Sequence, residues 1–345
     1  MEAAAVPQPK PPVFRRVAAA VWQNILWIGL AAWVLFYAFQ DPTETLDDVK
    51  TGISNGTIWA LIALGYTLVY GIIELINFAH GDVFMLGSFV AVSMWTWLGI
   101  SAGSSVIVII LGIAGVLIVS MLATGSLNVL IERVAYRPLR NAPKLAPLIT
   151  AIGMSFILQN VGSLWYGLPT SVPDLIGSQK TLFTIFDVDV VRSDVFAVAV
   201  TLPLLIALLT FVGQTRYGKA MRATAQDPDA ARLMGINVDR TIALTFLIGG
   251  LLAGAAGLIY ALYNGTIQFN QGFTAGLIAF TAAVMGGIGN IRGAVLGGLI
   301  IGFIQQISDN RIGTEWTPAI VFAYLVLIMV FRPSGLLGEE TREAG

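Results

Sequence analysis

Ten apolar segments recur along this chain of 345 residues, and they constrain its fold more than any other feature. A helix needs about 20 mostly apolar residues to cross the hydrocarbon core of a bilayer. We therefore predict an all-α polytopic membrane protein. The last three segments are short and glycine-rich, so one or two of them are expected to be broken or to cross incompletely. The segments are residues 17–39, 52–73, 82–100, 105–131, 146–166, 195–213, 241–263, 272–289, 293–308 and 316–331.

The composition agrees with this fold class. Hydrophobic residues make up 56% of the chain and charged residues only 11%, whereas soluble domains carry about 25% charged residues. No gap between the segments could hold a folded soluble domain. The longest gap, Gly167 to Asp194, contains Pro169, Pro173 and Gly177 and is expected to be an ordered loop with at most a small hairpin. The absence of cysteine excludes disulfides, thiolate metal sites and cysteine nucleophiles.

The distribution of Lys and Arg predicts the orientation of the bundle, because cytoplasmic connections are enriched in these residues. With the N-terminus in the cytoplasm, ten crossings place fifteen of the 19 Lys and Arg residues on the cytoplasmic side. Both termini are therefore predicted to be cytoplasmic, and the acidic residues within 41–48 are predicted to form an outer loop. The four basic residues on the outer side are Lys50, Lys180, Arg192 and Arg311.

The first apolar segment has two interpretations, because Arg15 and Arg16 precede it as they would precede the core of a signal peptide. Its apolar stretch is about 20 residues long, which exceeds the 7–15 residues of a signal-peptide core. No small-x-small cleavage pattern follows it. We therefore predict a retained transmembrane helix.

Polar residues interrupt the pattern between the second and third segments. Asn77, His80 (the only histidine) and Asp82 occur there, beside Phe78 and Gly81. Polar and ionisable groups are costly at membrane depth and persist mainly where they face a protein interior, a watery cavity or a boundary. We predict that residues 77–82 belong to a transport pathway.

These residues also have structural interpretations. His80 could hydrogen-bond a neighbouring carbonyl group while Asp82 caps the following helix, and Glu74 could pair with a cytoplasmic arginine. A second break, around Gly286 and Gly287, could serve close helix packing or line the pathway with backbone groups. Interrupted segments in matching positions of two halves point toward a site near the membrane midplane.

A further informative segment, residues 214–240, lies between the sixth and seventh apolar segments. Asp227 is a good N-cap, Pro228 suits the first helical position and Asp229 complements the helix dipole. Gly235 provides a C-terminal stop. We predict a helix of about two turns outside the membrane, which is too short to be stable alone and needs a docking surface. Its apolar contact residues would be Ala230, Ala231, Leu233 and Met234, ringed by arginines that include Arg232.

Residues 229–235, read as Asp-Ala-Ala-x-x-x-Gly, resemble the EAA-x-x-x-G cytoplasmic motif of ABC importer permeases, with Asp in place of Glu. The chain further resembles the LivH-type permeases of branched-chain amino acid ABC importers from about residue 50 to 338. Segment 17–39 is an addition to this pattern, and the Leu-Pro that follows the EAA motif in many other ABC permeases is absent. The resemblance rests on five blocks in order: 76–82, 131–138, 151–160, 233–240 and 286–294.

The resemblance implies a domain organisation and a set of partners. Residues 1–50 would be an N-terminal extension, 51–338 the permease domain and 339–345 a cytoplasmic tail. The partners implied are a second, LivM-like permease subunit, two ATPase subunits of the LivG and LivF type, and an extracytoplasmic solute-binding protein. The chain would sit among lipids of a bacterial cytoplasmic membrane and would not contact nucleic acid.

The resemblance also implies where ATP acts. The chain lacks the G-x-x-x-x-G-K-[ST] phosphate loop, so we expect it to bind no cofactor, while ATP and Mg bind to the ATPase subunits. The family includes relatives for urea, amides and other small polar solutes, which leaves the solute open. The residues expected to couple the permease to its ATPases are Asp227, Asp229, Ala230, Ala231, Arg232, Leu233 and Gly235.

Two other classes are less consistent with the sequence. A transporter driven by protons or sodium usually relies on acidic residues inside its spans, and here only Glu74 and Asp82 lie near a break. An intramembrane enzyme would need a zinc motif such as H-E-x-x-H or a nucleophile near His80, and the sequence shows neither. We therefore expect a transport subunit rather than an enzyme.

Overall fold

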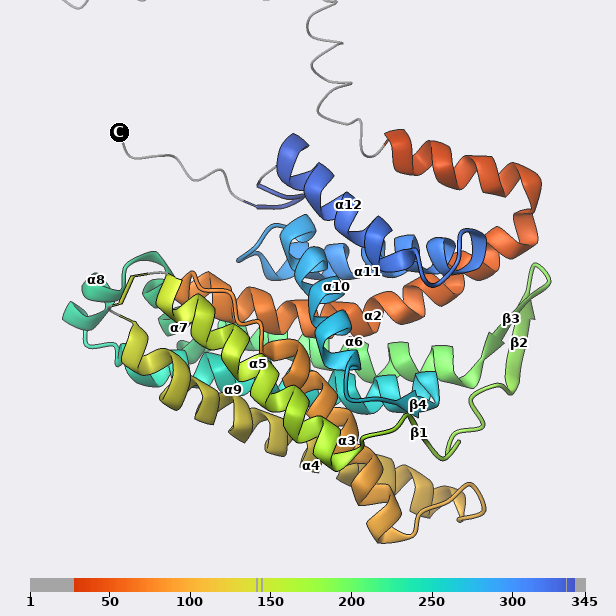
Figure 1. Cartoon of the computed structure of the whole chain (residues 1–345), viewed down its shortest axis with the longest axis horizontal. Coiled ribbons are helices and arrows are strands. Elements are labelled where there is room, and N and C mark those ends of the chain that lie inside the picture. Colours follow the sequence, from red (N-terminus) through yellow and green to blue (C-terminus); the bar gives the residue numbers. More distant parts are fainter. Residues whose placement is uncertain (1–27, 141, 144, 333, 339–345) are drawn as a thin grey trace, which may run out of the picture.

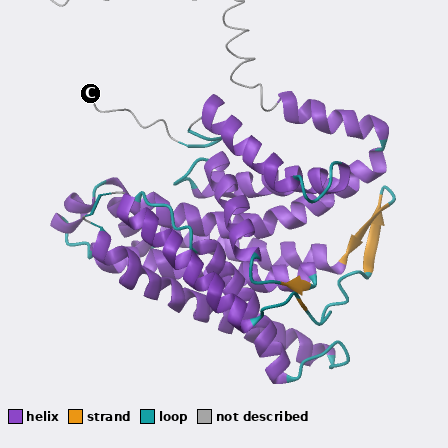
Figure 2. Cartoon of the chain, in the orientation of Figure 1, coloured by secondary structure: helices purple, strands orange, loops and turns teal. Residues whose placement is uncertain are grey.

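The computed structural model describes residues 28–140, 142–143, 145–332 and 334–338, and this part of the chain is a helical bundle with two small β-ladders (Figures 1 and 2). Its helices are Ile28–Gln40, α2 Pro42–Ile73, α3 His80–Leu98, α4 Val106–Ile131, α5 Leu145–Trp165, α6 Arg192–Gln214, α7 Arg216–Gln226, α8 Pro228–Leu233, α9 Val238–Asn264, α10 Gln271–Gly286, α11 Ile291–Arg311 and α12 Thr317–Phe331. A π-helical turn, η1 Glu132–Tyr136, and a 3₁₀ turn, η2 Arg137–Leu139, follow α4.

These helices coincide with the ten apolar segments, apart from α7 and α8. Seven described helical stretches are long and apolar enough to cross a membrane. Three are shorter: Ile28–Gln40, Gln271–Gly286 and Thr317–Phe331. Two of these, α10 and α12, belong to the three segments expected to be short. Residues 17–27 of the first segment lie outside the described residues.

Burial divides the bundle into a centre and a periphery. In α2 and α9, 72% of the most apolar 18-residue window is buried within the chain. The corresponding share is 22% in α6 and 11% in the stretch that begins with α4. An apolar helix that is not covered by its own chain must be covered by lipid or by another membrane protein. Helices α4, α5 and α6 therefore supply the faces open to lipid or a partner subunit.

Small residues allow the central helices to pack closely. At Gly52 of α2, a Cβ atom would lie 2.7 Å from the Cα of Phe303 in α11. One turn later, a Cβ at Gly56 would lie 2.7 Å from the Cα of Leu299. No side chain fits at such separations, and glycine at four-residue spacing is the usual means of close packing between membrane helices. The α2–α11 contact thus depends on glycine on both helices.

The connections gather at two ends of the bundle. The end at the right of Figure 1, which we name the hairpin end, carries the start of α2 and an antiparallel hairpin of β2 (Thr181–Ile185) and β3 (Val188–Val191). Lys50 joins them by donating to the carbonyl oxygen of Asp189 at 2.8 Å. This hairpin confirms the prediction for the longest gap. A second ladder, β1 (Thr170–Ser171) with β4 (Thr266–Ile267), was not predicted.

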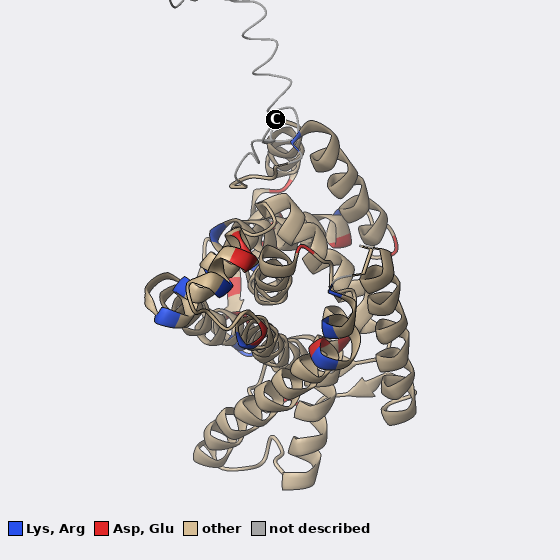
Figure 3. Cartoon of the chain, turned by 90° about the vertical axis from the view of Figure 1, so that its left-hand side faces the viewer, with Lys and Arg blue, Asp and Glu red and all other residues tan. Residues whose placement is uncertain are grey.

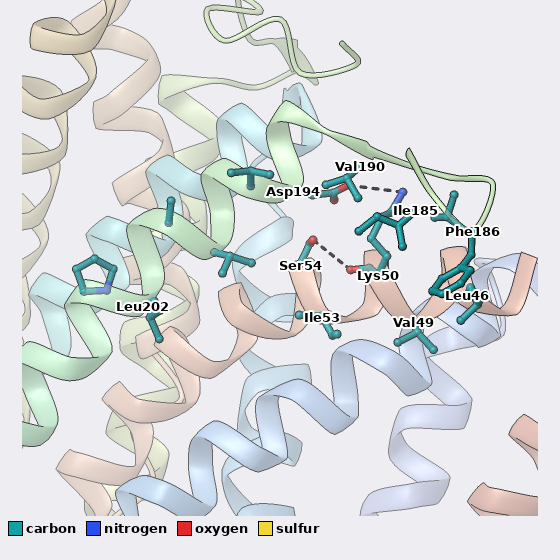
Figure 4. Close-up of a pocket in the computed structure, with 15 residues that line it drawn as sticks. Leu46, Val49, Lys50, Ile53, Ser54, Ile185, Phe186, Val190, Asp194 and Leu202 are labelled. Atoms are coloured by element: carbon teal, nitrogen blue, oxygen red, sulfur yellow. Dashed lines mark hydrogen bonds and ion pairs between the residues drawn. The ribbon is translucent and has the colours of Figure 1, made fainter. Parts of the chain in front are cut away.

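A mostly apolar groove of about 590 Å³ lies beneath the hairpin, between α2 and α6. Figure 4 shows Lys50 and Asp194 meeting at its edge, where the ammonium and carboxylate lie 3.6 Å apart. The guanidinium of Arg311 contacts the Glu44 carboxylate at 2.6 Å near the same end. These ion pairs tie α2 to α6 and α11.

The acidic residues Glu44, Asp47 and Asp48 are helical rather than looped, so this part of the prediction is wrong. Asp41 accepts a hydrogen bond from the backbone N–H of Glu44 at 3.0 Å and caps α2, which begins at Pro42. An Asp followed by Pro is a strong helix start, and acidic side chains are favourable in a first turn. Helix α2 therefore has 32 residues, and the predicted domain boundary at residue 50 falls inside it.

Candidate functional site

The break between α2 and α3 is a short irregular segment within the bundle. Helix α2 ends at Ile73, and Glu74 adopts a left-handed conformation with φ of +52°. The chain then turns at Asn77, whose carbonyl oxygen accepts from the backbone N–H of His80 at 3.0 Å. Helix α3 begins at His80, so Asp82 lies in its first turn and is not its cap. The alternative interpretation, in which Asp82 caps α3, is contradicted because the helix starts two residues earlier.

His80 lies deep between α2 and α9. Its imidazole is 0% exposed and packs edge-on against Tyr66, with ring centroids 4.9 Å apart. The ring occupies the space beside Gly65, where a Cβ atom would lie 2.1 Å from Nε2. Gly65 is eight residues before the end of α2, which corresponds to about 12 Å along a helix. The break therefore returns into the bundle before α3 begins.

Asp82 is also fully buried, and its carboxylate faces α5. The Ser155 hydroxyl donates to Asp82 Oδ2, and Gln159 donates to the Ser155 hydroxyl at 3.0 Å. On the other side, Gly272 of α10 leaves room for the carboxylate, since a Cβ there would lie 2.7 Å from Asp82 Oδ1. A buried carboxylate is costly unless polar groups satisfy it. Ser155 thus anchors α5, which is otherwise largely uncovered, to α3.

Asn77 is 1% exposed and belongs to a hydrogen-bonded cluster at the end of α4. The Tyr136 hydroxyl donates to Asn77 Oδ1 at 3.0 Å, and the Asn77 amide lies 3.5 Å from Asn128 Oδ1. Asn128 in turn donates to the carbonyl oxygen of Phe246 in α9 at 2.6 Å. Phe78 is only half-buried and contacts Phe280 of α10. This packing supports a structural role for the Asn77 amide.

The second break lies close to the first. A Cβ at Gly286 would lie 2.0 Å from the carbonyl oxygen of Gly293, so the turn between α10 and α11 closes on itself. Gly287 has a φ of +100° and contacts the backbone of Gly338. A small cavity of about 10 Å³ lies between the two breaks, lined by Tyr66, Tyr70, Ile76, Phe280, Ala283 and Ile288.

The segment 216–236 contains two helices. The predicted one is α8, and α7 precedes it. Asp227 ends α7 and starts α8, and its carboxylate accepts from the backbone N–H groups of Asp229 and Ala230, each at 2.9 Å. Gly235 has a φ of +82°, which favours glycine, and its N–H bonds to the carbonyl oxygen of Arg232. The start and stop signals are confirmed. Helix α7 was not predicted.

Helix α8 projects from the end opposite the hairpin, at the left of Figure 1. We name this the α8 end; Figure 3 views it directly and shows Lys, Arg, Asp and Glu on its ribbons. Leu233 and Met234 are 90% and 83% exposed, whereas Ala231 is buried against its own chain. The predicted contact surface therefore loses Ala231 and keeps Ala230, Leu233 and Met234. Asp229 and Arg232 pair across one turn at 2.6 Å.

An ion cluster at the α8 end was missed by the sequence analysis. The Asp239 carboxylate pairs with the guanidinium groups of Arg140 at 2.6 Å and Arg137 at 2.7 Å. Arg140 also pairs with Glu132, which is 1% exposed. These residues are 99 to 102 positions apart for the Asp239 contacts, so no local spacing could reveal them. The blocks 131–138 and 233–240 that carry the resemblance contain Glu132, Arg137 and Asp239, and Arg140 lies two residues beyond the first block.

The family model described as "Branched-chain amino acid transport system / permease component" matches residues 49–330. The chain belongs to this family. It is 42% identical over 304 residues to the high-affinity branched-chain amino acid transport system permease protein LivH of Escherichia coli K12, covering 86% of this chain and 97% of that protein. The corresponding protein BraD of Pseudomonas aeruginosa is 40% identical with the same coverage. Among solved structures, PsaBC from Streptococcus pneumoniae in complex with Fab matches at a TM-score of 0.42 and 13% identity, covering 87% of this chain and 95% of that one.

Membership of the permease family and the apolar helices establish a multi-pass membrane protein. Permeases of ABC importers work with ATPases and with a solute-binding protein, so this permease is one component of a larger transporter. The match starts at residue 49, inside α2. The preceding helix Ile28–Gln40 is therefore additional to the matched region.

Proposed function

We propose that this permease moves branched-chain amino acids across a bacterial cytoplasmic membrane. The observation that carries the proposal is the 42% identity to LivH of E. coli, which extends over 97% of that relative. The solute would arrive on an extracytoplasmic binding protein. The permease supplies half of the pathway, and a LivM-like second permease supplies the other half.

ATP drives the cycle from outside this chain. Two ATPase subunits of the LivG and LivF type bind ATP and Mg, and the permease itself binds no cofactor and catalyses no reaction. Helix α8 is the docking element for one ATPase. Its support is the exposed pair Leu233 and Met234, held between the Asp227 cap and the Gly235 stop. Exposed large apolar side chains surrounded by charged ones are typical of a protein-binding surface.

The α8 end faces the cytoplasm in this proposal, and the hairpin end faces outward. The bias of Lys and Arg toward one side supports the assignment. Both termini are then cytoplasmic. The hairpin, the start of α2 and the α9–α10 connection form the outer rim that receives the binding protein.

The solute passes beside the two breaks. Ile76 of the first break and Ile288 of the second line the small shared cavity, and Phe78 contacts Phe280, which also lines it. The glycine turn at Gly286 and Gly287 leads directly into Ile288. The remaining polar and small residues of the first break are buried behind this lining: Asn77, His80, Gly81 and Asp82. Helix interruptions at membrane depth are a recurrent feature of solute sites in transporters. A permease needs few strong contacts with its solute, because tight binding would slow release.

Uptake by the reconstituted transporter tests the proposal. The permease, its second permease and its ATPases would be placed in proteoliposomes with the cognate binding protein, and uptake of radiolabelled leucine, isoleucine and valine would be measured with and without ATP. ATP-dependent uptake of these three amino acids is the expected result. Uptake of urea or an amide in their place would contradict the solute assignment. ATP-independent uptake driven by an ion gradient would contradict the transporter class.

A further inference from the structure

Asp239 connects the docking helix to the rest of the bundle. Ile236 bonds back to Ala231 of α8 through its N–H at 3.0 Å, and the Asn237 side chain then caps α9 by accepting from Arg240 N at 3.0 Å. Asp239 follows in the first turn of α9. One backbone hydrogen bond and one capping hydrogen bond thus order the short connection between α8 and the first turn of α9, which contains Asp239.

The Asp239 carboxylate is held by both Arg137 and Arg140. Arg140 is only 18% exposed and also holds buried Glu132. The Arg140–Glu132 pair is buried, and removing one partner would leave the other charge uncompensated. Asp239 and Arg137 are 47% and 50% exposed and complete the cluster at its surface. The corner that follows α4 is therefore fastened to the start of α9 at this point.

That corner contains an unusual turn. Residues Glu132 to Tyr136 form a π-helical turn, and the N–H of Arg137 bonds back to the carbonyl oxygen of Glu132. Single π turns are rare and are frequently found at functional sites. Tyr136 is adjacent in sequence to Arg137, and its ring packs against Phe246 of α9 with centroids 5.4 Å apart. Arg137 therefore connects its ion pair with Asp239 to the π turn that contains Tyr136.

Tyr136 completes the connection to the break. Its hydroxyl donates to Asn77 Oδ1 at 3.0 Å, and the Asn77 carbonyl oxygen accepts from His80 N at the start of α3. A continuous set of contacts thus runs from α8 through Asp239, Arg137 and Tyr136 to the first residue of α3. We infer that Asp239, Arg137 and Tyr136 are positioning residues that transmit the movement of the ATPase-docking helix to the break in the solute pathway. The inference rests on the proposed function.

The decisive measurement is the ratio of solute moved to ATP hydrolysed in the complete reconstituted transporter. Tyr136→Phe removes one hydroxyl and keeps the ring, and Asp239→Asn removes one charge and keeps the shape. Each is expected to lower leucine taken up per ATP by at least about 5-fold, the lower range of measured coupling between sites. Assembly and basal ATP hydrolysis should stay at wild-type values. A small loss of thermal stability is expected in both variants, because Tyr136→Phe leaves Asn77 Oδ1 without its donor and Asp239→Asn removes one charge partner of Arg140. Asp239→Glu should retain a larger share of the wild-type ratio than Asp239→Asn.

Two variants at the hairpin end are matched controls. Tyr166→Phe removes a hydroxyl that lies 2.9 Å from Ser93 Oγ, and Asp47→Asn removes an ion pair with Lys50 at 2.7 Å. Neither touches the proposed connection, so both should keep the wild-type ratio. The double variant Tyr136→Phe/Asp239→Asn should be no worse than the poorer single variant, because both changes interrupt the same set of contacts.

The possible results are distinguishable. Wild-type ratios in Tyr136→Phe and Asp239→Asn would overturn the inference. So would a proportional fall of uptake and ATP hydrolysis with lowered thermal stability, because that pattern indicates a purely structural role. Fully additive effects in the double variant would show two separate roles and would also overturn it. Failure of the wild-type complex to take up leucine would instead count against the proposed function.

Discussion

The imidazole of His80 occupies the space that a side chain at Gly65 would need. A Cβ at position 65 would lie 2.1 Å from Nε2 and 2.5 Å from Cε1 of the ring. Gly65 belongs to α2 and His80 is the first residue of α3. This contact places the first residue of α3 beside Gly65, eight residues before the end of α2.

Gly65→Ala should destabilise the permease through overpacking, by about 1–3 kcal/mol. His80→Ala alone should also destabilise it, because it leaves a cavity beside Gly65. The double variant should be more stable than Gly65→Ala alone, since the removed ring makes room for the new methyl group. Thermal unfolding of the purified complex measures all three. Gly153→Ala in α5 is the control, because nothing lies within 4 Å of its Cβ position. If Gly65→Ala unfolds at the wild-type temperature, the packing described here is incorrect.

Asn77→Leu should lower leucine uptake while the complex still assembles and hydrolyses ATP. Leucine cannot accept from the Tyr136 hydroxyl or donate to Asn128, and an unsatisfied buried polar group costs about 1–3 kcal/mol. Uptake into proteoliposomes and ATP hydrolysis would be measured on the same preparation. Asn160→Leu is the matched control, because its amide is exposed and bonds only within α5, to Phe156 O. Wild-type uptake by Asn77→Leu would remove this residue from the pathway.

Gly235→Val should weaken coupling to the ATPases without affecting membrane insertion. Its φ of +82° disfavours a β-branched residue, so the turn after α8 must change and the exposed Leu233 and Met234 are displaced. Co-purification with the ATPases and uptake per ATP would be measured. Gly213→Val is the control, since that glycine has open space around it and a negative φ. Full coupling in Gly235→Val would argue against α8 as the docking helix.

Single cysteines should report the orientation, because the natural chain contains none. Leu233→Cys, at the α8 end, should react with a membrane-impermeant thiol reagent only after the cytoplasmic face is opened. Phe186→Cys, at the hairpin tip, should react in intact cells whose outer barrier has been permeabilised. Both side chains are highly exposed, at 90% and 81%. The reverse pattern would invert the topology, and labelling of both from one side would disprove the alternation of spans.

Local sequence signals predicted the helices well. The predicted segments 105–131 and 241–263 became Val106–Ile131 and Val238–Asn264, because an apolar run of spanning length has few alternatives in a membrane. The cap and the stop predicted α8 because Asp227 and Gly235 act on neighbouring backbone groups. Asp41 and Pro42 are a local signal for the start of α2, whereas the cluster of acidic residues around them favoured the incorrect prediction of a loop.

Contacts between distant residues could not be predicted in this way. Ser155 meets Asp82 across 73 positions, and Arg137 meets Asp239 across 102. Neither pair has a local spacing that distinguishes it from other polar residues. The depth of Asn77 depends likewise on how Tyr136 and Asn128 approach it from α4 and the π turn. Residue type identified the break as polar, and only the packing shows which groups its side chains satisfy.

Helix α8 carries both of its end signals within nine residues, from Asp227 to Gly235. The start and end of this helix are therefore set by residues of the segment itself and not by the spans on either side. Under the proposed docking, compatibility with an ATPase resides in Ala230, Leu233 and Met234. An exchange of residues 227–235 between related permeases should then transfer ATPase preference while the solute pathway stays as it was.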